Sequence, residues 1–154
     1  GKRSGILRCL KGTGIRFKVL TRNQEKSLVF LYRRKSFSEY LKRADVYEFL
    51  NAYGYESSEP EAMLEHLSER VCQYSDGKIC FPHEIGAFLD YPIDDVKCFI
   101  EKDGKDSLFS GYWKVYNNPG RAKLIFWAYD KAKTSAVNEY LVGKSIRDIA
   151  CIAA

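Results

Sequence analysis

The segment from Phe81 to Tyr116 carries the residue types that could do chemistry. His83 is one of two histidines in the chain, and Glu84 follows it directly. A neutral imidazole can act as a general base near neutral pH. Adjacent residues on a helix point about 100° apart, so Glu84 cannot be the group that orients His83. A catalytic His83 would therefore need another partner, and Ser110 is our candidate nucleophile because it precedes a strand expected beside His83.

A structural role for the same pair is the alternative. Pro82 is suited to the first turn of a helix, where Glu84 would favour the positive end of the helix dipole. His83 would then cap or hydrogen-bond a neighbouring loop. A structure with His83 against a backbone carbonyl, with no cleft and no nucleophile nearby, would exclude the enzyme hypothesis.

The cysteines do not form a pattern typical of metal sites or disulfides. Cys80 and His83 have a C-x₂-H spacing, but a second close pair of ligands is missing. Cys72 and Cys98 fall near apolar helix faces, where a buried thiol is the expected outcome. Five cysteines are an odd, widely spaced set, so we expect reduced thiols, no metal and no cofactor.

Charge is distributed unevenly along the chain. Residues 1–50 carry 13 basic and 4 acidic side chains, whereas residues 51–110 carry 5 basic and 13 acidic ones. The basic part could face an anionic partner, or it could pair with the acidic part inside one fold. The intramolecular pairing is the interpretation that we favour. If a partner surface exists, its candidate binding residues are Arg33, Arg34, Tyr112, Trp113 and Lys114.

The order of the predicted elements indicates an α+β fold. Strands are predicted over residues 14–20, 26–33 and 111–116, with the second apolar on both faces and therefore expected to be covered. We expect one domain over residues 1–154, with a small, mostly antiparallel sheet of about three strands covered by several helices. The predicted helices begin at three capping boxes, Ser36/Glu39, Ser58/Glu61 and Ser145/Asp148, and at Asp45, Pro82 and Pro92; two further helices are expected at 120–133 and 135–142.

Nothing in the sequence is typical of a membrane or secreted protein. No apolar run approaches the ~18 residues that a membrane-spanning helix needs. Gly1–Leu10 has basic residues but no apolar stretch after them, so we expect no secretory signal and a cytoplasmic location.

Two motifs resemble the signature of domain-of-unknown-function family 3793, which is found mainly in clostridia and related Firmicutes. They are Phe-Pro-His-Glu-Ile-Gly at 81–86 and Gly-Tyr-Trp-Lys-Val-Tyr at 111–116, and the likeness covers most of the chain. The resemblance implies a bacterial or phage-associated origin and places His83 and Glu84 near the start of the Tyr112–Tyr116 strand. Members often have cysteine where this chain has Ser110, which weakens any family-wide thiol chemistry here.

Taken together, these features favour a binding or regulatory module over an enzyme. The partner would be a protein or an anionic ligand, with nucleotide or nucleic acid as open alternatives, and inhibition of another bacterial or phage system is one form this could take. The alternative is a hydrolase or transferase centred on His83, with Glu84 and Ser110. The oligomeric state is not predicted by any feature of the sequence.

Overall fold

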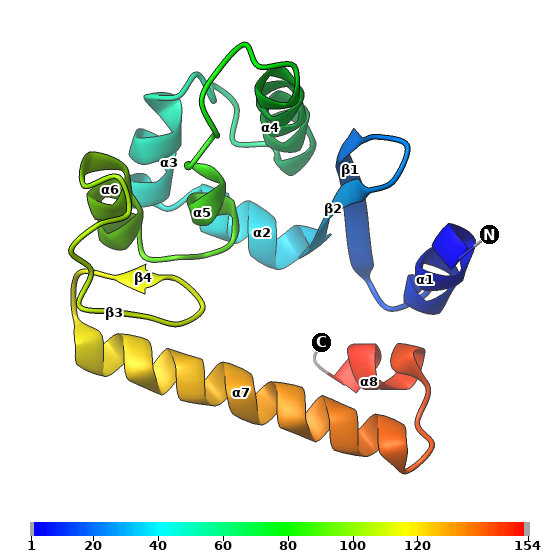
Figure 1. The fold of residues 1–154 in the computed structure, drawn as a ribbon. Helices are drawn as coiled ribbons and strands as arrows, with labels where there is room; N and C mark the ends of the chain where they lie inside the picture. Colours follow the sequence, from blue (N-terminus) through cyan, green and yellow to red (C-terminus); the bar gives the residue numbers. More distant parts are fainter. Residues whose placement is uncertain (1, 153–154) are drawn as a thin grey trace. The chain divides into compact units, whose positions relative to one another are not determined.

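The computed structural model describes residues 2–152, and within them the chain forms eight helices and four short strands in two compact units (Figure 1). One unit comprises residues 17–117, and the other comprises residues 2–16 and 118–152. Helices and strands are segregated rather than alternating, so the predicted α+β class is confirmed. A single domain over the whole chain stays a prediction.

The unit of residues 17–117 begins and ends with a β-hairpin. β1 (Ile15–Arg22), whose first residues precede the unit, pairs with β2 (Ser27–Arg33); β3 (Phe109–Ser110) pairs antiparallel with β4 (Lys114–Val115). The prediction of one sheet of about three strands is wrong in this detail, because the two hairpins form separate sheets. Five helices lie between them in sequence: α2 (Arg34–Leu41), α3 (Ala44–Asn51), α4 (Pro60–Ser75), α5 (Ile85–Phe88) and α6 (Ile93–Glu101).

The core of this unit is built from one apolar face of each helix, two residues of the first hairpin, and Tyr55 from the loop before α4. Burial of a large aliphatic or aromatic side chain contributes about 1.5–3 kcal/mol, so this cluster dominates the stability of the unit. Its buried members are Leu20, Phe30, Phe37, Leu41, Val46, Phe49, Leu50, Tyr55, Met63, Leu64, Leu67, Val71, Ala87, Phe88, Ile93 and Val96.

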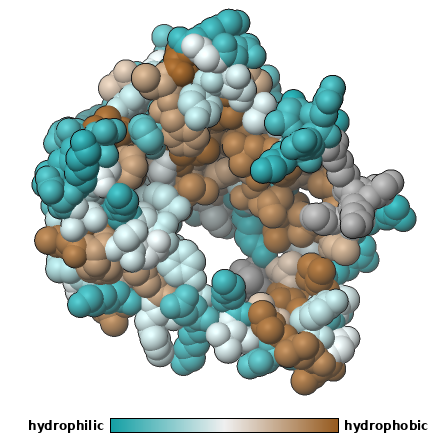
Figure 2. All heavy atoms as spheres, viewed as in Figure 1, coloured by the Kyte–Doolittle hydropathy of each residue, from teal (hydrophilic) through white to brown (hydrophobic). Residues whose placement is uncertain are grey.

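The first hairpin is less covered than its sequence predicts. Leu28, Val29 and Leu31 of β2 are 39–50% exposed, and only Phe30 is buried. In β1 the buried residue is Leu20, whereas Phe17 is 43% exposed. The expectation of a strand covered on both faces is wrong because, within this unit, the hairpin has no third strand and packs one side against the helices; Figure 2 shows the resulting hydrophobic surface over the hairpin.

The predicted helix starts differ from the observed ones by up to three residues. α6 begins directly after Pro92, as expected, whereas α4 begins at Pro60 with Glu59 as its N-cap, one residue later than the predicted Ser58 cap gives. α2, however, begins at Arg34, so Ser36 lies inside the helix and does not cap it. The Ser36/Glu39 capping box therefore placed the start of α2 three residues too late, because the observed N-cap is Arg33.

The second unit contains α1 (Lys2–Leu10), α7 (Pro119–Leu141) and α8 (Ile146–Ile152), and within it α8 contacts both α7 and α1 (Figure 1). The predicted break near residue 134 is wrong, because α7 is one helix of 23 residues. The predicted cap of α8 is present: Ser145 Oγ accepts from the backbone N–H of Asp148 at 3.1 Å and donates to its carboxylate at 2.6 Å. α1 was not predicted.

Candidate functional site

A pocket of about 300 Å³ lies between α5, α6 and the β3–β4 hairpin, entirely within residues 17–117. The buried residues Gly86, Val96 and Trp113 form its floor, whereas exposed residues of the hairpin form its rim. The complete lining is His83, Ile85, Gly86, Tyr91, Val96, Phe99, Ser110, Gly111, Tyr112, Trp113 and Lys114. Five of the eight predicted site residues are therefore together: His83, Ser110, Tyr112, Trp113 and Lys114.

His83 is placed by the turn that opens α5. The backbone N–H of Gly86 donates to the carbonyl of His83 at 3.1 Å, and that of Ile85 donates to Pro82 at 3.1 Å, so the chain coils before the helix begins. Tyr40 of α2 donates from its hydroxyl to the carbonyl of Ala87 at 2.5 Å and ties α5 to the core. Burial raises the pKa of Tyr40 far above its usual value, so this hydroxyl keeps the proton that it donates.

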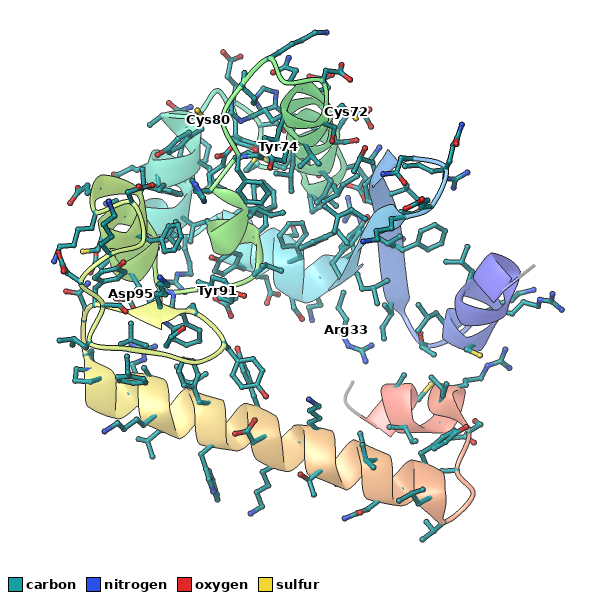
Figure 3. The ribbon with its side chains drawn as sticks, viewed as in Figure 1. Arg33, Cys72, Tyr74, Cys80, Tyr91 and Asp95 are labelled. Atoms are coloured by element: carbon teal, nitrogen blue, oxygen red, sulfur yellow. The ribbon has the colours of Figure 1, made fainter. Side chains whose placement is uncertain are left out.

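The β3–β4 hairpin is fixed to α6 by Asp95. The carboxylate of Asp95 is 2% exposed and accepts the indole N–H of Trp113 at 2.8 Å. It also accepts the backbone N–H groups of Tyr116 at 3.0 Å and Asn117 at 2.8 Å, and the amide of Asn117 at 3.1 Å. Because hydrogen bonds to an ionised carboxylate are strong, these four bonds hold the hairpin firmly against α6. Figure 3 shows Asp95 beside this hairpin, with Tyr91 in the adjoining loop.

Gly104 positions the cationic side of the pocket. Its φ of +68° lets the chain turn back after α6, where its N–H donates to the carbonyl of Phe99 at 2.8 Å. The ring of Phe99 lies so close that a Cβ at Gly104 would meet it at 2.9 Å. The carbonyl of Gly104 in turn accepts from the ammonium of Lys114 at 2.5 Å. Gly104 therefore helps to position both the Phe99 ring and the Lys114 ammonium.

Aromatic rings pack against each other on two sides of the pocket. The imidazole of His83 lies 5.1 Å from the ring of Phe99 and 5.1 Å from that of Phe81. The ring of Tyr91 lies 5.5 Å from that of Trp113, at an interplanar angle of 32°. These distances are in the range of favourable ring pairs, so the pairs stabilise the walls of the pocket.

The charge of the lining is one-sided. Lys114 is its only permanently charged residue, His83 is its only other group that can become cationic, and no aspartate or glutamate is among the lining residues. Among the described residues, the Lys114 ammonium has no carboxylate partner: it donates to Gly104 and lies 5.9 Å from the centre of the Phe99 ring. The pocket therefore favours a negatively charged group.

His83 and Ser110 share the pocket without forming a catalytic arrangement. In the part of the chain that the structure describes, the interactions of the His83 side chain are ring contacts with Phe81 and Phe99, and no hydrogen bond joins it to Ser110. No third group orients the imidazole there. The outcome is intermediate between the two predicted ones: a cleft with a nearby hydroxyl is present, but the imidazole is held by rings.

Glu84 is not among the residues that line the pocket, and it precedes α5, so the predicted place in the first turn of a helix from Pro82 is wrong. Its side chain is 1% exposed, forms an ion pair with Nε of Arg70 and accepts from the hydroxyl of Tyr55 at 3.1 Å. The hydrogen bond to Glu84 raises the pKa of Arg70, and burial together with the Glu84 charge raises that of Tyr55. Glu84 thus belongs to a buried charged network, and it does not line the pocket.

Arg33 and Arg34 lie at the end of β2 and the start of α2, away from the pocket lining (Figure 3 labels Arg33). The guanidinium of Arg34 donates to Glu61 at 2.8 Å, and Lys18 pairs with Glu65. These pairs join the basic first third to the acidic middle of the sequence, which supports the intramolecular interpretation of the charge asymmetry. A partner-binding role for both arginines stays a prediction.

The thiols differ from expectation, and His66 lies outside the pocket lining. Cys72 is exposed and Cys98 half-buried, so the predicted burial of both is wrong; Figure 3 shows Cys72 on α4 and Cys80 after it. His66, the other histidine of the chain, packs edge-on against the Tyr55 ring at 4.5 Å. Among the described residues, no group of three or more His, Cys, Asp or Glu side chains could hold a metal ion.

Fold and site together define an α+β protein with one small aromatic pocket of cationic character. The chain belongs to the family described as "Protein of unknown function (DUF3793)", whose sequence model matches residues 3–150, and the predicted resemblance is confirmed. No curated protein and no solved structure matches it. Among the described residues, no helix is both long and apolar enough to span a membrane.

Proposed function

We propose that this chain is a cytoplasmic binding or regulatory module, and that its pocket holds the anionic group of a small ligand. The observation that carries the proposal is the Lys114 ammonium: it faces a lining without carboxylates and is held in place by the carbonyl of Gly104. An ammonium has three donors, and only one of them is used by this carbonyl. Two remain for an anion.

The walls add to this preference. A partly desolvated site strengthens the attraction between an ammonium and an anion relative to water. The half-buried ring of Phe99, whose centre lies 5.9 Å from the ammonium, shields one side of it from water. The absence of an assembled catalytic group around His83 in the described residues favours binding over turnover.

The test uses Trp113 as a probe inside the pocket. The chain has two tryptophans, and Trp127 lies on α7 with 62% exposure, outside the pocket lining. The variant Trp127→Phe leaves Trp113 as the only tryptophan. We expect its fluorescence to change saturably when a panel of anions is titrated: inorganic phosphate, acetate, sugar phosphates, nucleotides and aromatic acids.

Lys114→Gln should weaken the binding of every responding anion at least tenfold, because it removes the charge and keeps most of the side chain. Lys97→Gln is the matched control, since Lys97 is an exposed lysine of α6 outside the lining. If no anion binds the pocket, or if binding survives Lys114→Gln unchanged, the proposed function is wrong.

The alternative is a hydrolase or transferase that uses His83 as a base and Ser110 as nucleophile. One observation favours it: both side chains line the same pocket. A hydroxyl is a weak nucleophile near neutral pH without an adjacent base, so this hypothesis requires the imidazole to reach Ser110 when substrate is bound. Turnover of an ester, peptide or phosphate substrate that is lost in both His83→Ala and Ser110→Ala would establish it, and would replace our proposal.

A further inference from the structure

We propose that the ligand of this pocket is a small molecule in which one flat ring carries a carboxylate or phosphate group. This inference rests on the proposed function and specifies the chemical class of the ligand. Its support is the combination of ring surfaces, one cation and a small volume in a single pocket.

The ring preference follows from the walls. Tyr91, Phe99, Tyr112 and Trp113 contribute rings to the lining, and the imidazole of His83 adds a fifth. Aromatic side chains bind flat rings by stacking and edge contacts, and this attraction is available to any base or aromatic acid. Aliphatic contacts come only from Ile85 and Val96. A saturated ligand could not stack on these rings, so it would gain less from the aromatic walls.

The position of the charge follows from Lys114. Its ammonium is fixed beside the Phe99 ring by the carbonyl of Gly104, so an anion bound there lies at the edge of the aromatic walls. A ligand must therefore place its charge next to its ring, separated by a short link. Carboxylates and phosphate monoesters both satisfy this geometry, because both accept hydrogen bonds from an ammonium.

The volume limits the ligand to one ring system. Ligand pockets in proteins span roughly 300–1,000 Å³, and this pocket of about 300 Å³ lies at the lower end. A dinucleotide or a stretch of nucleic acid would not fit inside. An aromatic carboxylic acid or the base and phosphate of a single nucleotide would.

The experiment compares sets of compounds that differ by one feature, using the Trp127→Phe protein and calorimetry as a second readout. One set is 4-hydroxybenzoate, its uncharged amide and its saturated ring analogue; the other is uridine 5′-monophosphate, uridine and ribose 5-phosphate. We expect at least one ring-bearing anion to bind ten or more times tighter than both of its partners. Whichever set responds identifies the source of the ring and charge.

Tyr112→Leu sharpens the comparison. Tyr112 is 40% exposed, so the variant should fold, and its melting temperature is the check. It should weaken the ring-bearing anion about tenfold and leave the ring-less one within twofold. If ring-less anions bind wild type as tightly as ring-bearing ones, or if only ring-less anions bind, this inference fails while the proposed function stands. If no anion binds at all, both fail.

Discussion

Two buried carboxylates flank the pocket, and they are held in different ways. Glu84 lies directly after His83 and is paired with the cation Arg70 and the hydroxyl of Tyr55. Asp95 lies on α6 and accepts only from neutral donors of Trp113, Tyr116 and Asn117. Each fixes one side of the pocket without lining it. Glu84 does so through an ion pair and Asp95 through directed hydrogen bonds.

The difference teaches what each side tolerates. A buried ion pair is stable only while both charges are present, because the remaining one is left without solvent. A carboxylate held by N–H groups depends instead on both of its oxygens being hydrogen-bond acceptors. We therefore expect the side of the pocket near His83 to lose stability when a charge of the ion pair is removed. The hairpin side should lose stability when one oxygen of Asp95 is replaced by a donor.

The largest expected effect is at Arg70. Arg70→Met removes the cation and leaves Glu84, 1% exposed, as an unpaired buried charge. We expect a loss of about 3–5 kcal/mol in the free energy of unfolding, measured by urea denaturation at neutral pH. Arg34→Met is the matched control, since it removes an arginine whose partner Glu61 is exposed. An equal loss in both variants would contradict the special role of the buried pair.

The next effect is at Asp95. Asp95→Asn keeps the shape, but its amide N–H₂ must face a donor, either the indole of Trp113 or the backbone N–H groups of Tyr116 and Asn117. We expect a loss of about 2–3 kcal/mol, together with faster amide exchange at Tyr116 and Asn117.

Asp94→Asn is the control for that change. Asp94 is exposed and shares the first turn of α6, so both variants lose the same favourable interaction with the helix dipole. Only Asp95→Asn should loosen the β3–β4 hairpin and weaken ligand binding. Normal exchange protection in Asp95→Asn would show that the hairpin is held by something else.

A smaller effect is expected at Gly104. Gly104→Ala and Gly77→Ala both place a side chain at positive φ, at +68° and +73°. A Cβ at Gly77 meets nothing within 4 Å, whereas one at Gly104 meets the Phe99 ring. We therefore expect Gly104→Ala to lose about 1 kcal/mol more than Gly77→Ala in thermal unfolding, and to weaken anion binding. Equal losses would mean that Phe99 moves aside freely.

Sequence reasoning found the pocket residues but not what holds them. His83 was recognisable from its residue type, but only Lys114–Val115 of the predicted 111–116 strand is a strand, and residues 111–113 form the bend of the hairpin. The role of Asp95 was not predicted, because its donors lie 18–22 residues further along the chain. No local pattern records a contact of that kind.

The same limit explains the errors in the elements. Arg70, the partner of Glu84, is on another helix, so the sequence pattern indicated only the adjacent His83 as a neighbour. In β2 the apolar run predicted coverage on both faces, yet apolar composition does not say how many strands a sheet has. The prediction of two helices, at 120–133 and 135–142, missed that α7 is continuous, although nothing from Arg121 to Leu141 is glycine or proline.

The smallest effect extends the comparison to an exposed carboxylate. Asp45, in the first turn of α3, accepts from the guanidinium of Arg43 at 2.7 Å and 3.1 Å, and this hydrogen bonding holds its pKa below the usual value. Both side chains are about half exposed, so solvent screens the pair, and Arg43→Gln should lose well under 1 kcal/mol at pH 7.

Because the folded pKa of Asp45 is lower than the unfolded one, this stabilisation is complete above the unfolded pKa of about 3.9 and disappears as pH falls through the folded value. The difference between Arg43→Gln and wild type in urea denaturation should therefore be lost in acid, once the pH lies below the folded pKa of Asp45. A difference that persists there would mean that Arg43 stabilises α3 by packing on the Tyr40 ring, 5.5 Å away, and not through the carboxylate.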